Sequence, residues 1–209
     1  MSLSHLLALT SLTSYGRLIL SMREHLLKQH NFSEDDLERI LAHFTKKKFK
    51  RKELLVRKGD VTRNVYFINR GCMRSYLTDY HSKEHTILFG TEGYWMGDLH
   101  GFVNKSAALY NYQAIEDTEV MAINKASWDK LMSEEPSFVS YVSTLFRNAL
   151  MVQQERIVEF FTLSAEERYE NLLMHRSDIL NRVPQKYIAS YIGITPEFFS
   201  QIRRKQSMR

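Results

Sequence analysis

The spacing of apolar positions changes twice along the chain and predicts two kinds of structure. After Ser33-Glu34-Asp35-Asp36, apolar residues recur at helical spacing, which predicts a capped amphipathic helix. Between Glu53 and Ile123, short segments rich in Val, Ile, Tyr and Phe alternate with turn residues. The predicted strands are Leu54–Val56, Val65–Ile68, Met73–Leu77, Thr86–Phe89, Tyr110–Ile115 and Glu119–Ile123. Strands at this nearly regular spacing predict an antiparallel roll or barrel.

Beyond Ala126 the spacing becomes helical again, and Pro136 suits the first turn of a long helix. Two apolar stripes follow that helix. The first, at the steps of four and three of a coiled-coil seam, is Phe138, Val142, Leu145, Ala149 and Val152. The second is Tyr141, Phe146, Leu150, Ile157 and Phe160. We expect the roll to cover one stripe and a second subunit to cover the other, with the first stripe as the dimer interface. A helix buried within its own domain is the alternative.

The C-terminal region opens with a capping box, Ser164-Ala165-Glu166-Glu167, and contains the strongest functional pattern of the sequence. Segment 184–204, PQKYIASYIGITPEFFSQIRR, predicts a helix, a turn and a second helix. Ile188 and Ile192 share the inner face of the first helix, and the small Ala189 lets the second helix approach closely. Gly193 falls at the turn, where glycine adopts a positive φ without penalty.

The second helix of this pattern has the features of a recognition helix in the DNA major groove. Thr195 suits its N-cap and Pro196 its first turn, while Phe199 and Ile202 face the first helix. We assign base contacts to Pro196, Glu197, Phe198, Ser200 and Gln201. Glu197 can accept a hydrogen bond from cytosine, and Gln201 can pair with adenine. An ordinary helical hairpin is the alternative, which the spacing of small, turn and apolar residues disfavours.

Charge supports a polyanionic partner. The net charge is +5, and from Leu163 onward eight Lys and Arg residues face five acids. The expected phosphate contacts are Arg182, Lys186, Arg203, Arg204 and Lys205. The basic run Lys46–Lys52 could be a second nucleic-acid patch, but we expect a solvated lead-in to a strand.

Cysteine content and hydropathy limit the class of protein. Cys72 is the single cysteine, so one chain cannot form an internal disulfide, a four-cysteine iron–sulfur cluster or a zinc ribbon. No apolar run approaches the roughly 20 residues of a membrane span, so we expect a cytoplasmic protein without a membrane partner. Residues 1–30 are expected to be an N-terminal extension, in which Met22 is a second candidate for the native start.

From about Ser33 to Lys205 the layout resembles the cyclic-AMP receptor protein/fumarate-nitrate regulator (Crp/Fnr) superfamily. Besides the helix-turn-helix, segments 53–60, 65–71 and 113–120 are similar to the family's β-roll. The resemblance implies an α+β fold with an N-terminal antiparallel β-roll, a long dimerisation helix and a C-terminal winged helix-turn-helix. The implied domains are 31–135, 136–162 and 163–209. The implied function is transcription regulation by a homodimer on duplex DNA, with RNA polymerase as a further candidate partner.

The effector site departs from the family's pattern. In cyclic-nucleotide binders of the family, a Gly-Glu pair holds the ribose and a later Arg-Ser or Arg-Thr pair holds the cyclic phosphate. Gly97-Asp98 is similar to the first pair, but Ala108-Leu109 stands at the second. Because the arginine that would neutralise the phosphate is missing, we expect weak or no binding of cyclic AMP. We expect no cofactor and no metal. An unidentified small ligand is an option, and its candidate lining is Tyr94, Trp95, Phe102, Tyr110 and Tyr112, although such residues are more often core.

Two further features of the family, a four-cysteine cluster and a wing, also differ in this sequence. The four-cysteine cluster of its oxygen-sensing branch is absent, and few residues follow Lys205, so we expect any wing to be formed around Asp178–Val183 or to be missing. One alternative function is a sensor or interaction module with a degenerate DNA-binding part. A cupin-like metalloenzyme is a less favoured alternative, because His81, His85 and His100 do not form the expected ligand set and no catalytic motif is present.

Overall fold

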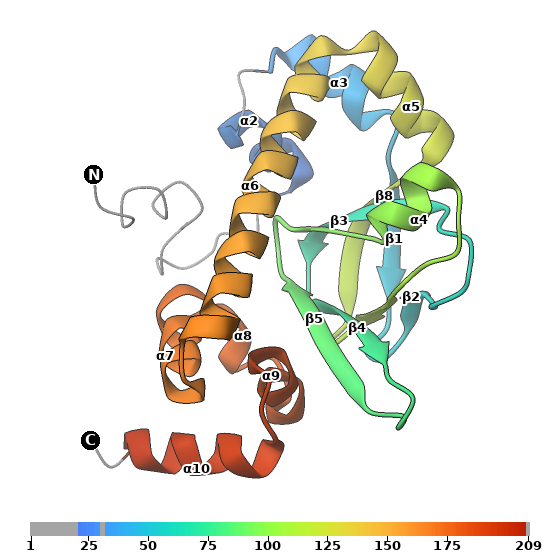
Figure 1. Cartoon of the computed structure of the whole chain (residues 1–209). Helices are drawn as coiled ribbons and strands as arrows, with labels where there is room; N and C mark the ends of the chain where they lie inside the picture. Colours follow the sequence, from blue (N-terminus) through green and yellow to red (C-terminus); the bar gives the residue numbers. More distant parts are fainter. Residues whose placement is uncertain (1–20, 30–31, 208–209) are drawn as a thin grey trace. The chain divides into compact units, whose positions relative to one another are not determined.

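The short segments rich in β-branched and aromatic residues pair into two four-stranded antiparallel sheets, which form the predicted β-roll (Figure 1). The computed structural model describes residues 21–29 and 32–207. The chain has two compact units, and the boundary between them falls between Ser143 and Thr144. The roll and the helices that cover it make up the first unit.

The two sheets have the strand orders β1-β8-β3-β6 and β2-β7-β4-β5. The strands of the first are β1 (Thr45–Phe49), β8 (Thr118–Asn124), β3 (Asn64–Arg70) and β6 (Trp95–Met96). The strands of the second are β2 (Leu54–Val56), β7 (Asn111–Ala114), β4 (Met73–Thr78) and β5 (Glu84–Gly90). The predicted strands are confirmed as β2, β3, β4, β5, β7 and β8.

The central strands β3 and β8 are apolar on both faces, which explains their dense Val, Ile and Phe content. Phe67 pairs with Met121, and both side chains join a core cluster shared with the covering helices. The next pair, Ile68 and Val120, points to the other face and joins the cluster inside the roll. Alternate residues of one strand therefore support two separate cores.

Three elements of the roll were missed by the sequence pattern. The basic run was expected to lead into a strand, but Lys46, Lys47 and Lys48 lie within the edge strand β1. Four of the five β1 residues are exposed, and pairing with β8 rather than burial makes the segment a strand. The two-residue strand β6 and helix α4 (Leu99–Asn104) are too short to show a periodic pattern.

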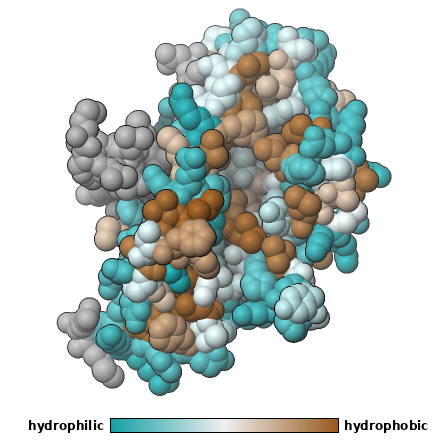
Figure 2. Space-filling view, viewed as in Figure 1, coloured by the Kyte–Doolittle hydropathy of each residue, from teal (hydrophilic) through white to brown (hydrophobic). Residues whose placement is uncertain are grey.

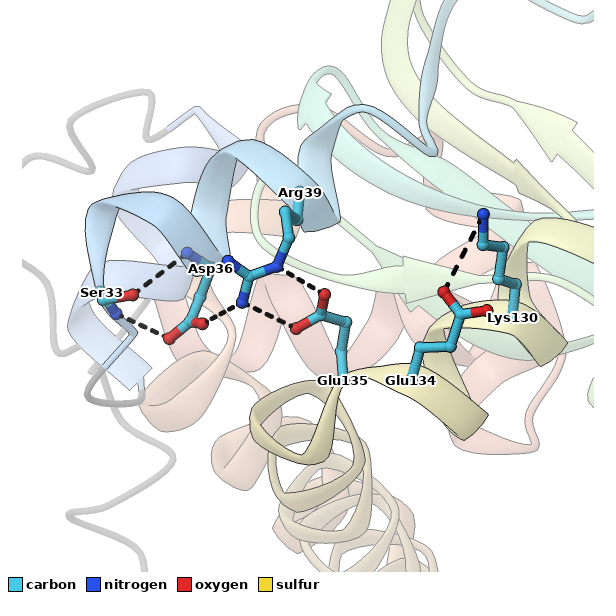
Figure 3. Close-up of polar contacts among 6 residues, drawn as sticks. All are labelled: Ser33, Asp36, Arg39, Lys130, Glu134 and Glu135. Carbon is cyan, nitrogen blue, oxygen red and sulfur yellow. Dashed lines mark hydrogen bonds and ion pairs between the residues drawn. The ribbon is translucent and has the colours of Figure 1, made fainter.

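The helix predicted after Ser33 is present as α3 (Glu34–Leu41), and its capping box is confirmed, with Asp36 at the third helical position. Arg39 of α3 donates to both carboxylate oxygens of Glu135, at 2.7 and 3.1 Å, and to Asp36 at 2.6 Å (Figure 3). Glu135 stands between α5 (Lys125–Glu134) and α6 (Pro136–Thr162). This ion-pair network therefore joins α3 to the start of the long helix.

Helix α2 (Met22–Gln29) packs on the roll and carries a largely buried histidine, His25. Met22 and Leu26 of α2 belong to the core cluster that the roll shares with its covering helices, although residues 1–30 were predicted to be an extension. The Tyr141 hydroxyl accepts a hydrogen bond from Trp95 Nε1 at 2.8 Å and lies 3.2 Å from His25 Nε2. Burial lowers the pKa of His25 to about 4, so the imidazole is neutral near pH 7.

The long helix α6 begins at Pro136, as predicted. Both of its apolar stripes are buried at its N-terminal end and become exposed toward its C-terminal end. Its first turns bury Phe138, Tyr141 and Val142, which come from both stripes, in the core of the roll. Toward its C-terminal end, apolar side chains gather on the surface (Figure 2). The exposed ones are Phe146, Leu150, Ile157, Val158, Phe160 and Phe161.

The second unit continues with four helices after α6. They are α7 (Ala165–His175), α8 (Ser177–Leu180), α9 (Gln185–Ile192) and α10 (Pro196–Ser207). The capping box that opens α7 is confirmed, because Ser164 and Glu167 satisfy each other's backbone amides. Tyr169 and Leu172 of α7 are buried, whereas Leu173 is partly exposed.

Candidate nucleic-acid interface

Helices α9 and α10 form the predicted helix-turn-helix. Ile188, Ala189 and Ile192 are buried on the inner face of α9, and Phe199 and Ile202 are buried on the facing side of α10. This agrees with the spacing of apolar and small residues in the sequence. The ring of Phe199 also meets Tyr169 of α7 edge-on, with 5.1 Å between ring centroids.

The turn between the two helices depends on Gly193. Its φ of +80° is in the left-handed region, and the amide of Ile194 donates to the Ala189 carbonyl at 3.0 Å. This pairing ends α9 with its last carbonyls satisfied. Helix α10 then begins with Thr195 Oγ1, which accepts from the Phe198 amide at 3.3 Å. The predicted capping residue and first helical residue are therefore in place.

The outer face of α10 carries the residues predicted to contact bases. Pro196, Glu197 and Gln201 are exposed, and Phe198 is partly exposed at the edge of this face. Ser200 is half-buried, and its hydroxyl donates to the Pro196 carbonyl at 2.9 Å. At 100° per residue, Glu197 and Gln201 share one outward stripe, which Arg204 continues.

Of the five predicted phosphate contacts, four are exposed. Lys186 stands in the first turn of α9, and the others close α10 as the run Arg203-Arg204-Lys205. Residues of both helices, Gln185, Ser200, Arg203 and Arg204, line one shallow depression. The fold therefore brings the start of α9 beside the basic end of α10. Arg182 lies before α9 and is half-buried.

Of the two outcomes expected for the wing, a wing around Asp178–Val183 or none, the described residues after α6 show the second. The candidate segment Asp178–Val183 contains helix α8 and a turn, in which the Val183 amide donates to the Ile179 carbonyl at 2.9 Å. Within residues 125–207 all regular structure is helical. A wing needs two paired strands, and the short connection between α7 and α9 is already used by α8. Among the described residues, α10 therefore carries the side chains predicted to contact bases without strands beside it.

In the roll, Asp98 is the residue that the sequence resemblance sets at the ribose-binding position of cyclic-nucleotide binders. Its side chain is buried, with 2% exposed, and it accepts hydrogen bonds from three backbone amides. The donors are Gly101 at 2.8 Å, Leu109 at 2.5 Å and Tyr110 at 3.2 Å. The carboxylate thus caps α4 and holds the following loop. Both of its oxygens already accept hydrogen bonds from backbone amides of the protein.

The Ala108-Leu109 pair lies where the family's phosphate-binding pair stands. Ala108 is buried, and its backbone is paired with the loop at Gly59-Asp60. Leu109 is 47% exposed and offers no charge. Of the aromatic residues considered as a ligand lining, Phe102 and Tyr112 are buried in the two cores. Trp95, Tyr94 and Tyr110 pack against these cores and are partly buried.

The structure divides the five residues predicted for the dimer interface. Phe138 and Val142 are buried within their own chain, so they cannot also meet a second subunit in this conformation. Leu145 and Val152 are half-buried and Ala149 is exposed. Four of the larger exposed side chains, Phe146, Leu150, Ile157 and Phe160, come from the second stripe, and Val158 and Phe161 belong to neither stripe. The physical reason is that the roll takes up the first turns of α6 whole, rather than one of its stripes.

The three histidines considered for a metal site do not converge. His85 Nε2 lies 2.7 Å from Asp79 Oδ2 in the β4–β5 hairpin, while His100 belongs to α4. Asp79 also accepts from the backbone amides of His81 and Lys83, so it organises the turn. In the described part of the chain, no three His, Cys, Asp or Glu residues are grouped to hold a metal ion.

A β-roll and a helix-turn-helix on one chain define a class of protein, the DNA-binding regulators with a sensor-type domain. Residues 46–135 match the family described as "Cyclic nucleotide-binding domain". The regulatory protein HlyX of Actinobacillus pleuropneumoniae is 24% identical over 189 residues, which cover 84% of this chain and 75% of HlyX. The fumarate and nitrate reduction regulatory protein of Vibrio cholerae is 26% identical, covering 80% of this chain and 70% of that protein.

Solved structures agree on the fold. The c-di-GMP responsive global regulator CLP of Xanthomonas campestris superposes with a TM-score of 0.70 at 15% identity, over 84% of this chain and 92% of CLP. In sequence over most of its length, and in fold, the chain is similar to transcription regulators of the Crp/Fnr type. In the described residues, no helix is both long and apolar enough to cross a membrane.

Proposed function

We propose that this chain is a homodimeric transcription regulator that binds an inverted-repeat DNA site through α10, without cyclic AMP. The observation that carries the proposal is the outward stripe of Glu197 and Gln201 on a correctly capped recognition helix, beside a basic helix end. The exposed apolar residues of α6 support pairing with a second copy. We place the protein in the cytoplasm, with RNA polymerase as its expected partner at promoters. We expect no enzymatic activity.

Selection from a random duplex library, carried out at two salt concentrations, tests this function. We expect enrichment of an inverted repeat whose half-sites are centred about 10 base pairs apart, because a two-fold dimer presents its two α10 helices to one face of the duplex. Steeply salt-dependent binding without sequence preference would instead favour the sensor or interaction module with a degenerate DNA-binding part.

Replacing Gln201 with alanine is expected to cost about 1–3 kcal/mol of binding free energy per half-site and to relax the preference at one base pair. The matched control is Lys186→Ala, which removes an exposed charge at the start of α9. That variant is expected to weaken all sites alike and to flatten the salt dependence. Fluorescence anisotropy on the selected site and its single-base variants measures both effects. If Gln201→Ala also weakens all sites alike, Gln201 is not a base reader.

Cyclic AMP is expected to give no calorimetric signal at micromolar concentrations. Ala108 stands at the position of the family's phosphate-binding arginine, so the phosphate would lack a countercharge, and the amides of Leu109 and Tyr110 already donate to Asp98. Titration with linear AMP controls for adenine binding elsewhere. Micromolar affinity specific to the cyclic nucleotide would show that the roll rearranges to accept it, and would overturn this part of the proposal.

A further inference from the structure

Arg168 of α7 lies at the place where two other helices end. Its Nε donates to the carbonyl of Ile192, the last residue of α9, at 2.9 Å. Its Nη1 donates to the carbonyl of Leu163, just after α6, at 2.6 Å. Carbonyls at a helix C-terminus carry partial negative charge and lack partners within the helix. One planar guanidinium therefore bridges the ends of α6 and α9, which a single ammonium group is poorly shaped to do.

Further contacts attach the last turns of α6 to the helix-turn-helix. The ring of Phe160 covers the turn, since a Cβ added to Gly193 would lie 2.8 Å from its Cε2 atom. The Arg168 guanidinium lies 5.3 Å from the centroid of the same ring. The other contacts are Arg156 stacked 4.1 Å over the ring of Tyr191 and Asn171 bonded to Glu159 at 3.0 Å.

Only Leu163 and Ser164 separate α6 from α7, and such a short link would by itself leave the angle between the helices undetermined. The contacts of Arg168, Phe160, Arg156 and Asn171 fix the angle between α6 and α7 within the C-terminal unit. Arg168 is central to them, because it touches the link, the end of α9 and the Phe160 ring. The end of α6, α7 and α9 are thereby held as one piece.

We infer that Arg168 is a positioning residue that fixes the direction of the recognition helix relative to α6 and so selects the spacing between DNA half-sites. This inference rests on the proposed function, in which two copies pair along α6. In such a dimer the separation of the two α10 helices depends on how each is attached to its α6. Adding one base pair moves a half-site by about 3.4 Å along the duplex and rotates it about the axis. If α10 is held rigidly relative to α6, the dimer loses affinity for a repeat of altered spacing. If α10 is held loosely, the dimer binds both spacings with similar affinity.

The test compares Arg168→Gln and Arg168→Lys with Arg147→Gln, which removes an exposed charge from α6 in the same unit. Each protein is titrated with the selected inverted repeat, with the same repeat one base pair longer or shorter at its centre, and with a single half-site. We expect the wild type and Arg147→Gln to prefer the selected spacing by about tenfold or more. Arg168→Gln should retain its half-site affinity while this ratio falls severalfold, and Arg168→Lys should lie between them.

Two results would overturn the inference while leaving the proposed function standing. One is an equal loss of affinity on every duplex, the single half-site included, which would give Arg168 a purely structural role. The other is an unchanged spacing ratio. If thermal melting shows that Arg168→Gln does not fold, the spacing ratio of Arg168→Lys decides in the same way. A wild-type protein without any spacing preference would overturn the proposed dimeric function, and with it the inference.

Discussion

Replacing Asp98 with alanine is expected to destabilise the roll by about 3–5 kcal/mol, because three backbone amides lose a charged acceptor inside the protein. The side chain is almost fully buried, so water cannot replace it without a rearrangement of α4 and the loop after it. Urea unfolding followed by tryptophan fluorescence measures the loss. Trp95 and Trp128 are the two tryptophans and both pack in or against the core of the roll, so the signal reports on this unit.

Asp60→Ala is the matched control for this prediction, because Asp60 is an exposed aspartate in the loop that pairs with Ala108. Its substitution should leave the unfolding midpoint nearly unchanged. Asp98→Asn keeps one carbonyl acceptor and should fall between the two. If Asp98→Ala unfolds at the same urea concentration as Asp60→Ala, the carboxylate does not hold the loop. Asp98 would then be free to meet a ligand, against the expectation of weak or no binding of cyclic AMP.

Acidification from pH 6.5 to pH 4 is expected to remove about 3 kcal/mol of stability through His25 alone. Burial lowers the pKa of His25 to about 4 in the folded protein, whereas an unfolded histidine titrates near pH 6.5. Between these values the unfolded chain binds a proton that the folded chain does not, so stability is full above pH 6.5 and falls as the pH drops. Urea unfolding at a series of pH values measures this slope.

The slope between pH 6.5 and about pH 5 should largely disappear when His25 is replaced by glutamine, even if that variant is less stable at pH 7. His81→Gln, in the exposed turn after β4, is the control that should keep the wild-type slope. Carboxylates add to the loss toward the acid end of the window, because contacts in the folded protein lower the pKa values of Glu119, Glu135 and Glu167. The hydrogen bond to His85 and the turn amides lower the pKa of Asp79 to about 2, so its contribution is lost only below about pH 4. A wild-type protein with flat stability from pH 6.5 to 4 would contradict the assignment to His25.

Local signals in the sequence predicted the DNA-binding part almost completely. Capping residues, a glycine at a turn and apolar residues three or four apart act within a few residues of each other, so neither Ser164 nor Gly193 needs distant contacts to be interpreted. The same holds for the strands with buried faces. The resemblance to a known family added the order of the domains and pointed to Asp98.

Features that depend on distant parts of the chain were not predictable. Strand β1 exists because β8 lies beside it, and its own residues carry almost no apolar signal. The assignment of Phe138 and Val142 to a dimer interface followed from periodicity, which cannot tell a partner subunit from the chain's own core. The network of His25 and Tyr141 joins residues 116 positions apart, and no spacing rule connects them.

The lysines of β1 have a consequence for how copies of this protein behave when crowded together. β1 is an outermost strand of its sheet, so its free backbone edge could accept a strand from another molecule. Lys46, Lys47 and Lys48 are exposed along this edge, and of the three Lys48 is paired with Glu119 of β8 at 2.7 Å. We expect these positive charges to make the addition unfavourable, because an identical edge would bring like charges together. Their contribution to the net charge would then serve to keep copies of the protein apart rather than to bind DNA.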